Sequence, residues 1–154
     1  MAAYQFKSGA HIPKGVSAEG IMAERDRIEH DFGKATIEHA VDAVLKDPDG
    51  YPNLRAFGPA DEGAAMRQGI AEGIRRAFRA VVIIRDAPKP QAQARQIRVL
   101  HNVQDNDGDL VYRPITAIRQ SPDQRKYLIG QLRRDADSFA DKLRDTLAEI
   151  EEAS

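Results

Sequence analysis

One polar stretch of the chain carries aspartates at alternate positions, namely Asp105, Asp107 and Asp109. Side-chain oxygens at this spacing open the calcium loop of an EF-hand. The rest of that loop is missing, because Leu110 stands where glycine is required and Thr116 stands where the bidentate glutamate belongs. Segments with strand character flank the aspartates. We therefore interpret residues 105–109 as a polar hairpin turn and predict no metal site.

No other residue set has the spacing of a catalytic or cofactor-binding motif. The chain has no cysteine, which excludes disulfides, thiolate zinc sites and thiol nucleophiles. Its four histidines are scattered, without an HExxH pair. No serine lies in a Gly-x-Ser-x-Gly setting, and neither GxGxxG nor GxxxxGK occurs. The sequence predicts a protein that is not an enzyme, with no cofactor and no evident small-molecule substrate.

Charge is distributed unevenly, although the formal net charge is only −1. Residues 1–62 carry 7 basic and 11 acidic side chains, and residues 135–154 carry 2 basic and 7 acidic ones. The segment between them, residues 63–134, carries 14 basic and 6 acidic side chains, and most of the basic ones are arginines. The near-neutral total therefore does not exclude binding to a polyanion.

Arginine is well suited to phosphate contacts, and a basic stripe is typical of nucleic-acid-binding proteins. The residues that we predict to contact DNA phosphates are Arg75, Arg76, Arg79, Lys89, Arg95 and Arg98. The same side chains could instead pair with the acidic residues of the first two helices, or with the acidic C-terminal segment of a neighbouring copy. The sequence leaves open whether this basic segment forms one open face.

Hydrophobic periodicity predicts three helices in the first half of the chain. Ser17 is a suitable N-cap for a helix that ends at Gly33, and Thr36 caps a second helix that runs to about Lys46. Residues 47–53 have the composition of a turn. A third helix begins near Pro59 and continues to about Phe78. Its internal glycines suggest either a close approach of another backbone or a helix that needs its neighbours to persist.

Strands follow the third helix. Residues 81–85 form a short strand in which the first four residues are apolar and β-branched, and residues 97–102 alternate with a period of two. Residues 110–113 form a return strand after the aspartate turn. A three-stranded antiparallel meander is the arrangement that this order favours.

A long helix is predicted from Pro122 to about Glu152, because Ser121 and Pro122 form a typical helix start. Its apolar residues recur at spacings of four, four and three, which is an 11-residue period. About 30 helical residues span about 45 Å, more than a three-stranded sheet covers. We therefore predict an oligomer interface formed by Leu132, Phe139, Leu143, Leu147 and Ile150.

Taken together, these elements predict an α+β fold. Residues 1–16 form an irregular N-terminal arm, and residues 17–154 form one domain. Within that domain, residues 17–80 are helical, residues 81–114 form the meander, and residues 121–152 form the long helix. The chain has no apolar run of the roughly 20 residues that a membrane span needs, and we predict a cytoplasmic protein.

The order of these features resembles a family of small uncharacterised phage- and prophage-encoded proteins. The likeness rests on residues 15–19, on Asp47-Pro48 followed by Leu54 and Phe57, and on an Arg-rich helix end that runs into a Val/Ile strand. This chain has Gly58-Pro59 where the family usually has an aromatic residue and an acid. The resemblance implies a phage-encoded factor that acts on DNA or on a protein partner in the host cytoplasm.

Two functions remain open at this point. The first is a non-enzymatic DNA-binding or regulatory factor that contacts the phosphates of double-stranded DNA through its Arg-rich segment. The alternative is a protein-interaction or structural adaptor that forms homo-oligomers through its long C-terminal helix.

Overall fold

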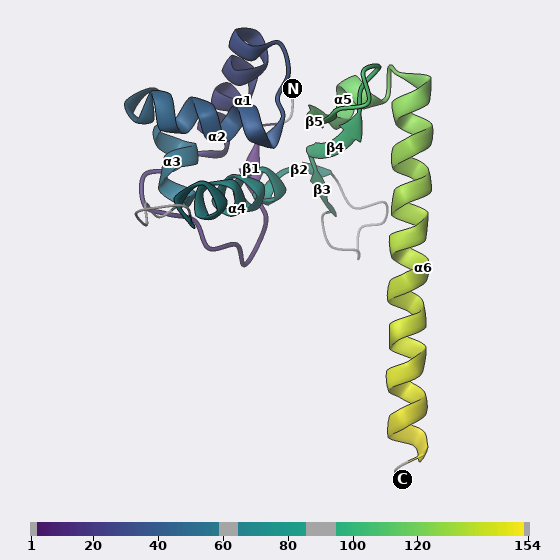
Figure 1. The fold of residues 1–154 in the computed structure, drawn as a ribbon. Coiled ribbons are helices and arrows are strands. Elements are labelled where there is room, and N and C mark those ends of the chain that lie inside the picture. The colour runs from purple at the N-terminus through teal and green to yellow at the C-terminus, as the bar shows by residue number, and fades with distance from the viewer. Residues whose placement is uncertain (1–2, 59–64, 86–94, 153–154) are drawn as a thin grey trace.

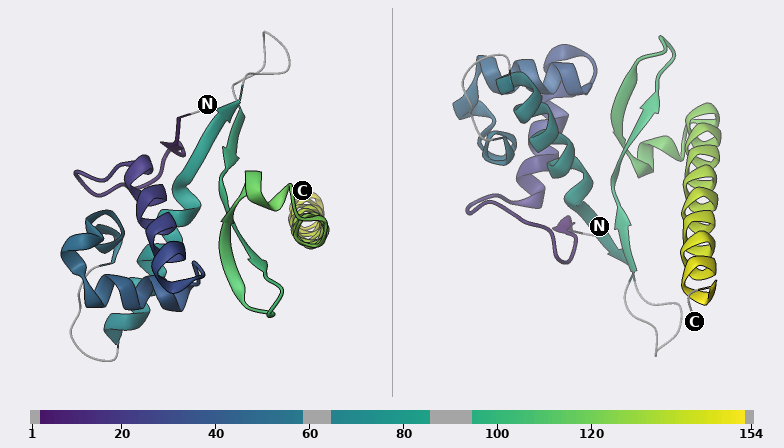
Figure 2. Two further views of the ribbon diagram at one scale, coloured as in Figure 1. Left: turned by 90° about the horizontal axis from the view of Figure 1, so that it is seen from above. Right: turned by 60° about the horizontal axis from the view of Figure 1, so that its bottom comes forward.

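The computed structural model describes residues 3–58, 65–85 and 95–152. It shows a helical N-terminal part, two small antiparallel sheets and a long C-terminal helix, which confirms the α+β class (Figure 1). The helical part and the first sheet form one body, and the C-terminal helix lies beyond the second sheet (Figure 2).

The first two helices begin and end where the sequence predicts. Helix α1 spans Ala18–Phe32, with the Ser17 side chain accepting a hydrogen bond from the Gly20 amide at 3.0 Å. Gly33 ends it with a φ of 82°, a conformation that glycine adopts without steric cost. Helix α2 spans Ile37–Lys46 and is capped in the same way by Thr36.

Helical structure also occupies most of the segment that the sequence predicts as a turn. A short 3-10 helix, η1, spans Pro48–Gly50, and helix α3 spans Pro52–Phe57. The buried Glu24 carboxylate of α1 accepts hydrogen bonds from the amides of Asn53 and Leu54, both at 3.0 Å. The cap of α3 thus comes from a residue that is remote in the sequence, so local composition could not reveal this helix.

Helix α4 spans Ala65–Ala80, and the start predicted for it near Pro59 lies outside the described residues. Gly73 confirms the predicted close approach of another backbone, because a Cβ there would overlap the Phe57 carbonyl of α3. Glycine is therefore needed where α3 and α4 cross.

The strands are antiparallel, but the predicted meander is divided between two sheets. Strand β2 (Val81–Arg85) pairs with β3 (Arg95–Arg98), while β4 (Leu100–Gln104) pairs with β5 (Leu110–Pro114). The division falls at Val99, whose amide donates to Val81 while its carbonyl accepts from Ile115. In a regular strand both groups would face one neighbour, so the chain leaves the first sheet here and enters the second.

The N-terminal arm is not entirely irregular. Strand β1 (Gln5–Phe6) pairs with the other edge of β2 and completes the first sheet in the order β1-β2-β3. A strand of two residues has no periodicity of its own, and its position depends on β2.

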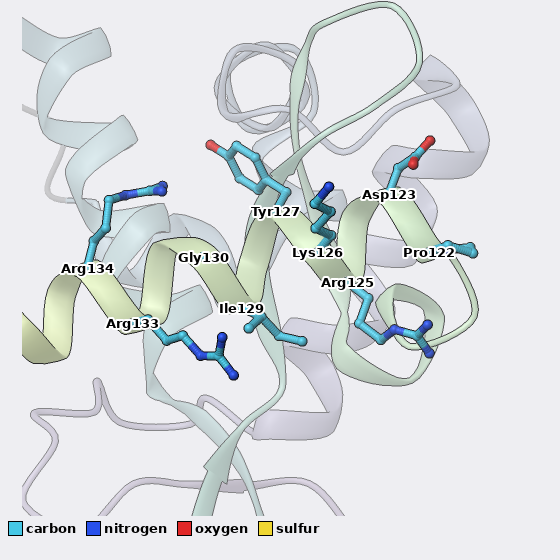
Figure 3. A pocket seen from close by; sticks show the side chains of 9 residues that line it. All are labelled: Pro122, Asp123, Arg125, Lys126, Tyr127, Ile129, Gly130, Arg133 and Arg134. Carbon is cyan, nitrogen blue, oxygen red and sulfur yellow. The ribbon is translucent and has the colours of Figure 1, made fainter.

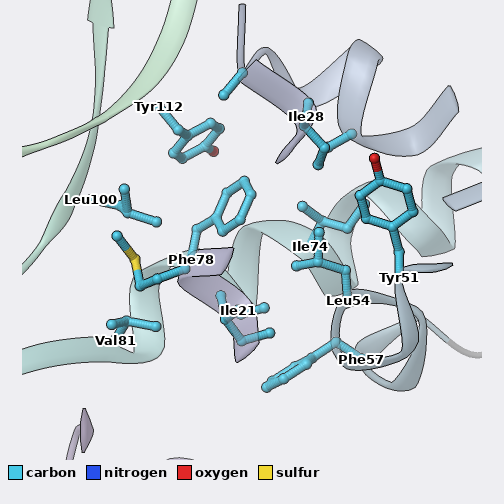
Figure 4. Close-up of a cluster of buried hydrophobic side chains, with 14 of the residues drawn as sticks. Ile21, Ile28, Tyr51, Leu54, Phe57, Ile74, Phe78, Val81, Leu100 and Tyr112 are labelled. Carbon is cyan, nitrogen blue, oxygen red and sulfur yellow. The ribbon is translucent and has the colours of Figure 1, made fainter. Parts of the chain in front are cut away.

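The main core lies where the helices α1 to α4 pack together and meet the sheets (Figure 4). Phe78, Ile21, Ile74 and Leu100 are fully buried, and the Phe78 ring lies 4.8 Å from that of Tyr112, centroid to centroid. A second, smaller cluster lies between the second sheet, α5 (Ile115–Ile118) and the start of α6 (Pro122–Glu152). Its buried members are Val103, Val111, Ile118 and Leu128.

Among the described residues, helix α6 packs on the second sheet and on α5 through its N-terminal end, and then extends away from the body (Figure 1). Among the helices in the described ranges, none combines the length and the apolar character that crossing a membrane requires.

Candidate functional site

The apolar stripe of α6 is the largest exposed hydrophobic feature in the described part of the chain. All five residues predicted to form an oligomer interface are exposed, with exposed fractions between 49% and 64%. Ile129, one turn before the first of them, is 43% exposed. The structure thus brings these residues together on one helix face and leaves them uncovered.

In the described part of the chain, the body anchors α6 through its first turns. Leu128 is buried in the small cluster, and the Gln124 side chain bridges the second sheet, donating to the Gln104 carbonyl at 3.2 Å and accepting from Arg113. From Leu132 to Glu152 every side chain is exposed except Ala140, which is half-buried. The stripe therefore projects past the surface that anchors the helix.

Charge changes sign along α6. Residues 122–134 contain four basic side chains and one acidic one, whereas residues 135–152 contain two basic and seven acidic ones. An open hollow of about 870 Å³ lies beside the basic part of the helix, at Gly130. Its lining includes Arg125, Ile129 and Arg133 on one side of the helix and Lys126 and Arg134 on another (Figure 3). These side chains extend from different sides of one helix, so the hollow is an open basic surface and not an enclosed site.

Of the predicted phosphate-binding residues, Arg75 faces the acidic helix α2. It lines a groove of about 380 Å³ between α2 and α4 together with Glu38. In the same groove Arg67 pairs with Asp42 of α2 at 2.7 Å. In this part of the Arg-rich segment, basic side chains thus lie beside the acidic residues of α2, as the alternative to DNA binding predicts.

Arg76 and Arg79 line a different pocket, on the side of α4 that faces the N-terminal arm. This pocket of about 230 Å³ also contains Lys7 and His11, with Phe57 in its wall. Arg76 donates to the Phe57 carbonyl at 2.9 Å. Sequence analysis did not select Lys7 and His11, because only the pairing of β1 with β2 brings the arm to this end of α4.

The remaining predicted residues are spread over the first sheet. Arg98 is half-buried and donates to the Leu100 carbonyl at 2.8 Å. Burial lowers its pKa, and the nearby charge of Arg79 lowers it further, against the opposing effect of Tyr112. Arg95 is exposed at the start of β3, and Lys89 lies outside the described residues. Of the five described residues of the set, Arg76 and Arg79 thus line one pocket, whereas Arg75 lines another.

The three aspartates of the hairpin turn converge on a lysine. Their carboxylate oxygens lie within 4.8 Å of one another, and the Lys34 ammonium is 2.7 to 2.8 Å from each. Hydrogen bonds to Asp105 first, and then to Asp107 and Asp109, raise the pKa of Lys34, and Lys34 in turn lowers the pKa of Asp105. The ammonium balances the carboxylates and ties the β4–β5 turn to the loop between α1 and α2.

No family model, curated protein or solved structure matches this chain. The resemblance to phage and prophage proteins therefore stays a prediction from short motifs, and arguments about function depend on the surfaces described above.

Proposed function

We propose that this protein is a structural interaction module that self-associates through α6. The observation that supports this proposal is the row of five large apolar side chains exposed on a helix that extends beyond its own core. Contiguous exposed apolar patches of this kind mark interaction sites. In proteins, most helical stability comes from packing an amphipathic face, so a partner would also stabilise α6 itself.

The partner that we propose is a second copy of α6 in antiparallel orientation. Such a pair places the basic first half of each helix beside the acidic second half of the other, whereas a parallel pair places like charges together. The apolar spacing suits this arrangement, because it reads almost the same in either direction. Leu132 then lies opposite Leu147, Ala136 lies opposite Leu143, and Phe139 lies near the two-fold axis.

Self-association is tested by measuring the mass of the full chain by light scattering across a concentration series. The wild-type protein should be dimeric at high concentration, and Leu143→Glu should be monomeric because it places a charge in the stripe. Ala148→Glu is the matched control, since it adds the same charge on the side of α6 away from the stripe. A wild-type monomer throughout the series, or equal loss of mass in both variants, would contradict the proposal.

Orientation is tested by cross-linking, which is simple because the chain has no cysteine. Chains carrying Leu132→Cys are mixed with chains carrying Leu147→Cys and then oxidised. An antiparallel pair gives the mixed disulfide, because the two positions face each other only in that orientation. Disulfides formed mainly between two copies of Leu132→Cys would instead indicate a parallel pair.

DNA binding stays as a second proposal, favoured by the basic first turns of α6 and by Arg76 and Arg79, which lie against no described carboxylate. A salt titration of duplex binding tests it, because log K falls by about 0.9 per log unit of salt for each phosphate neutralised. Absence of duplex binding at about 50 mM salt, where such contacts are strongest, would rule this function out.

A further inference from the structure

The pocket at the C-terminal end of α4 is built from two segments that lie far apart in the sequence. The amide of Lys7 donates to the carbonyl of Ala80 at 2.8 Å, which fixes the end of β1 against the last turn of α4. The chain then turns through Gly9, at a φ of 79°, while the amide of Ala10 donates back to Lys7 at 3.3 Å. This turn brings His11 to the same pocket.

Cationic side chains dominate the pocket, and none of the described residues that line it carries a carboxylate. Within the described ranges, Lys7 and Arg79 have no ion-pair partner. Arg76 uses one N–H on the Phe57 carbonyl, which holds its guanidinium in place, and its other donors have no partner among the described residues. Two fixed segments thus direct positive charge into one cavity of about 230 Å³.

The helix dipole explains only part of this arrangement. A cation in the last turn of a helix is favoured by the partial negative charge there, and Arg79 satisfies that requirement for α4. It does not explain why Lys7, from a separate strand, lies at the same place. Arg79 is also close enough to Arg98 for the two positive charges to disfavour each other. A bound anion would relieve this repulsion.

We propose that the pocket formed by Lys7, His11, Arg76 and Arg79 binds a phosphate group. Arginine forks match phosphate oxygens in charge and geometry, and lysine adds a point charge. The cavity of about 230 Å³ has room for several water molecules, each of which takes about 30 Å³ in the liquid. This volume suits one phosphate group with a small substituent. This site is independent of α6, and its failure would leave the self-association proposal unaffected.

Inorganic phosphate is the probe, added to the full chain against chloride at matched ionic strength. We expect phosphate, but not chloride, to raise the Tm and to move the backbone amide NMR signals of Lys7 to His11. Arg79→Gln should weaken phosphate binding at least tenfold. Arg75→Gln, which removes the same charge from the opposite groove of α4, should change it less than twofold. Equal effects of phosphate and chloride, or equal losses in both variants, would overturn the proposal.

A competition experiment distinguishes the sources of the phosphate group. Glycerol phosphate and a short DNA duplex are each titrated into the phosphate-loaded protein, and the signals of Lys7 to His11 are followed. Displacement by glycerol phosphate at lower concentration supports a small phosphomonoester ligand, and displacement by the duplex at lower concentration supports the nucleic-acid backbone. If neither competitor moves these signals away from their phosphate-bound positions, the pocket does not recognise phosphate esters and the proposal is wrong.

Discussion

The body buries its large apolar side chains, whereas the distal part of α6 exposes them. In the body, residues such as Phe78 and Ile74 are completely buried, and Arg67 and Arg25 have acidic partners nearby. Beyond Leu132, α6 exposes every large apolar side chain that it carries. The difference indicates that the body is stable through its own packing, whereas the distal helix has an apolar face suited to another molecule.

The largest difference in the free energy of unfolding should come from replacing a phenylalanine by alanine in each of the two regions. Phe78→Ala removes a fully buried ring and should lower the free energy of unfolding by about 3–5 kcal/mol. Phe139→Ala removes an exposed ring and should change the unfolding of the dilute protein by less than about 0.5 kcal/mol, while weakening self-association. Urea denaturation and a concentration series of light scattering measure the two effects. A large loss of stability for Phe139→Ala at low concentration would remove the contrast.

A smaller loss is expected from Glu24→Gln, which tests the contact that orders α3. The buried carboxylate accepts amide hydrogen bonds from Asn53 and Leu54, and the neutral amide has only one acceptor oxygen. The free energy of unfolding should fall by about 1–3 kcal/mol. Glu72→Gln, on the exposed surface of α4, is the matched control and should have little effect. Equal stability of Glu24→Gln and the wild type in urea would show that α3 forms without this cap.

The body should also lose stability in mild acid through His101. This side chain is buried and donates to the Arg98 carbonyl at 3.1 Å. Burial, and then the charge of Arg98, hold its pKa below the ordinary value of 6.5. Between that lowered pKa and 6.5 the unfolded chain binds a proton that the folded state does not, so stability falls as the pH drops through this window.

In this window the free energy of unfolding should fall by at most about 1.4 kcal/mol per pH unit, and this dependence on pH should disappear in His101→Gln. Denaturation curves collected between pH 7 and pH 5 measure it. His30→Gln, which removes an exposed imidazole from α1, provides the control for loss of a histidine. An unchanged slope in His101→Gln would assign the acid sensitivity to other groups.

The smallest effect should come from Lys34→Gln, which leaves the three carboxylates of the hairpin turn without their shared ammonium. We expect a lower Tm near neutral pH, since like charges then face one another. Lys34 lowers the pKa of Asp105 below its ordinary value of 3.8, so its contribution is present above that pH and is lost as the pH falls through the lowered pKa. The variant should therefore show a flatter pH dependence below about pH 4.

Calcium sharpens this last test, because Lys34 lies where a cation would bind the three aspartates. Added Ca²⁺ should leave the Tm of the wild type unchanged and should partly restore that of Lys34→Gln. Lys14→Gln, on the exposed arm, controls for the loss of one positive charge. A Tm increase in the wild type would show that calcium displaces the ammonium.

Features with local causes could be predicted from the sequence. Ser17, Thr36 and Gly33 mark helix ends through hydrogen bonds and backbone conformations within a few residues, and the structure confirms them. The apolar spacing of α6 is likewise a local property, and in one continuous helix this spacing places the side chains on one face. The aspartate hairpin was predicted as a turn, although its lysine partner was not.

Features that depend on distant contacts could not be predicted in this way. Helix α3 is capped by Glu24, and the break at Val99 is set by hydrogen bonds to two different neighbours. The Arg-rich segment reads as one continuous feature in the sequence, but neighbouring residues of a helix face different directions. Arg75 consequently lies toward α2, while Arg76 lines the pocket beside the N-terminal arm.

The sequence by itself determined the α+β class, the boundaries of α1, α2 and α6, and the apolar stripe, because capping and periodicity act over single turns of helix. Only the tertiary structure decided that the stripe is uncovered, that Lys34 neutralises the aspartates, and that Lys7 meets Arg76 and Arg79. These outcomes depend on which segments pack together, and such contacts join residues that no local pattern relates.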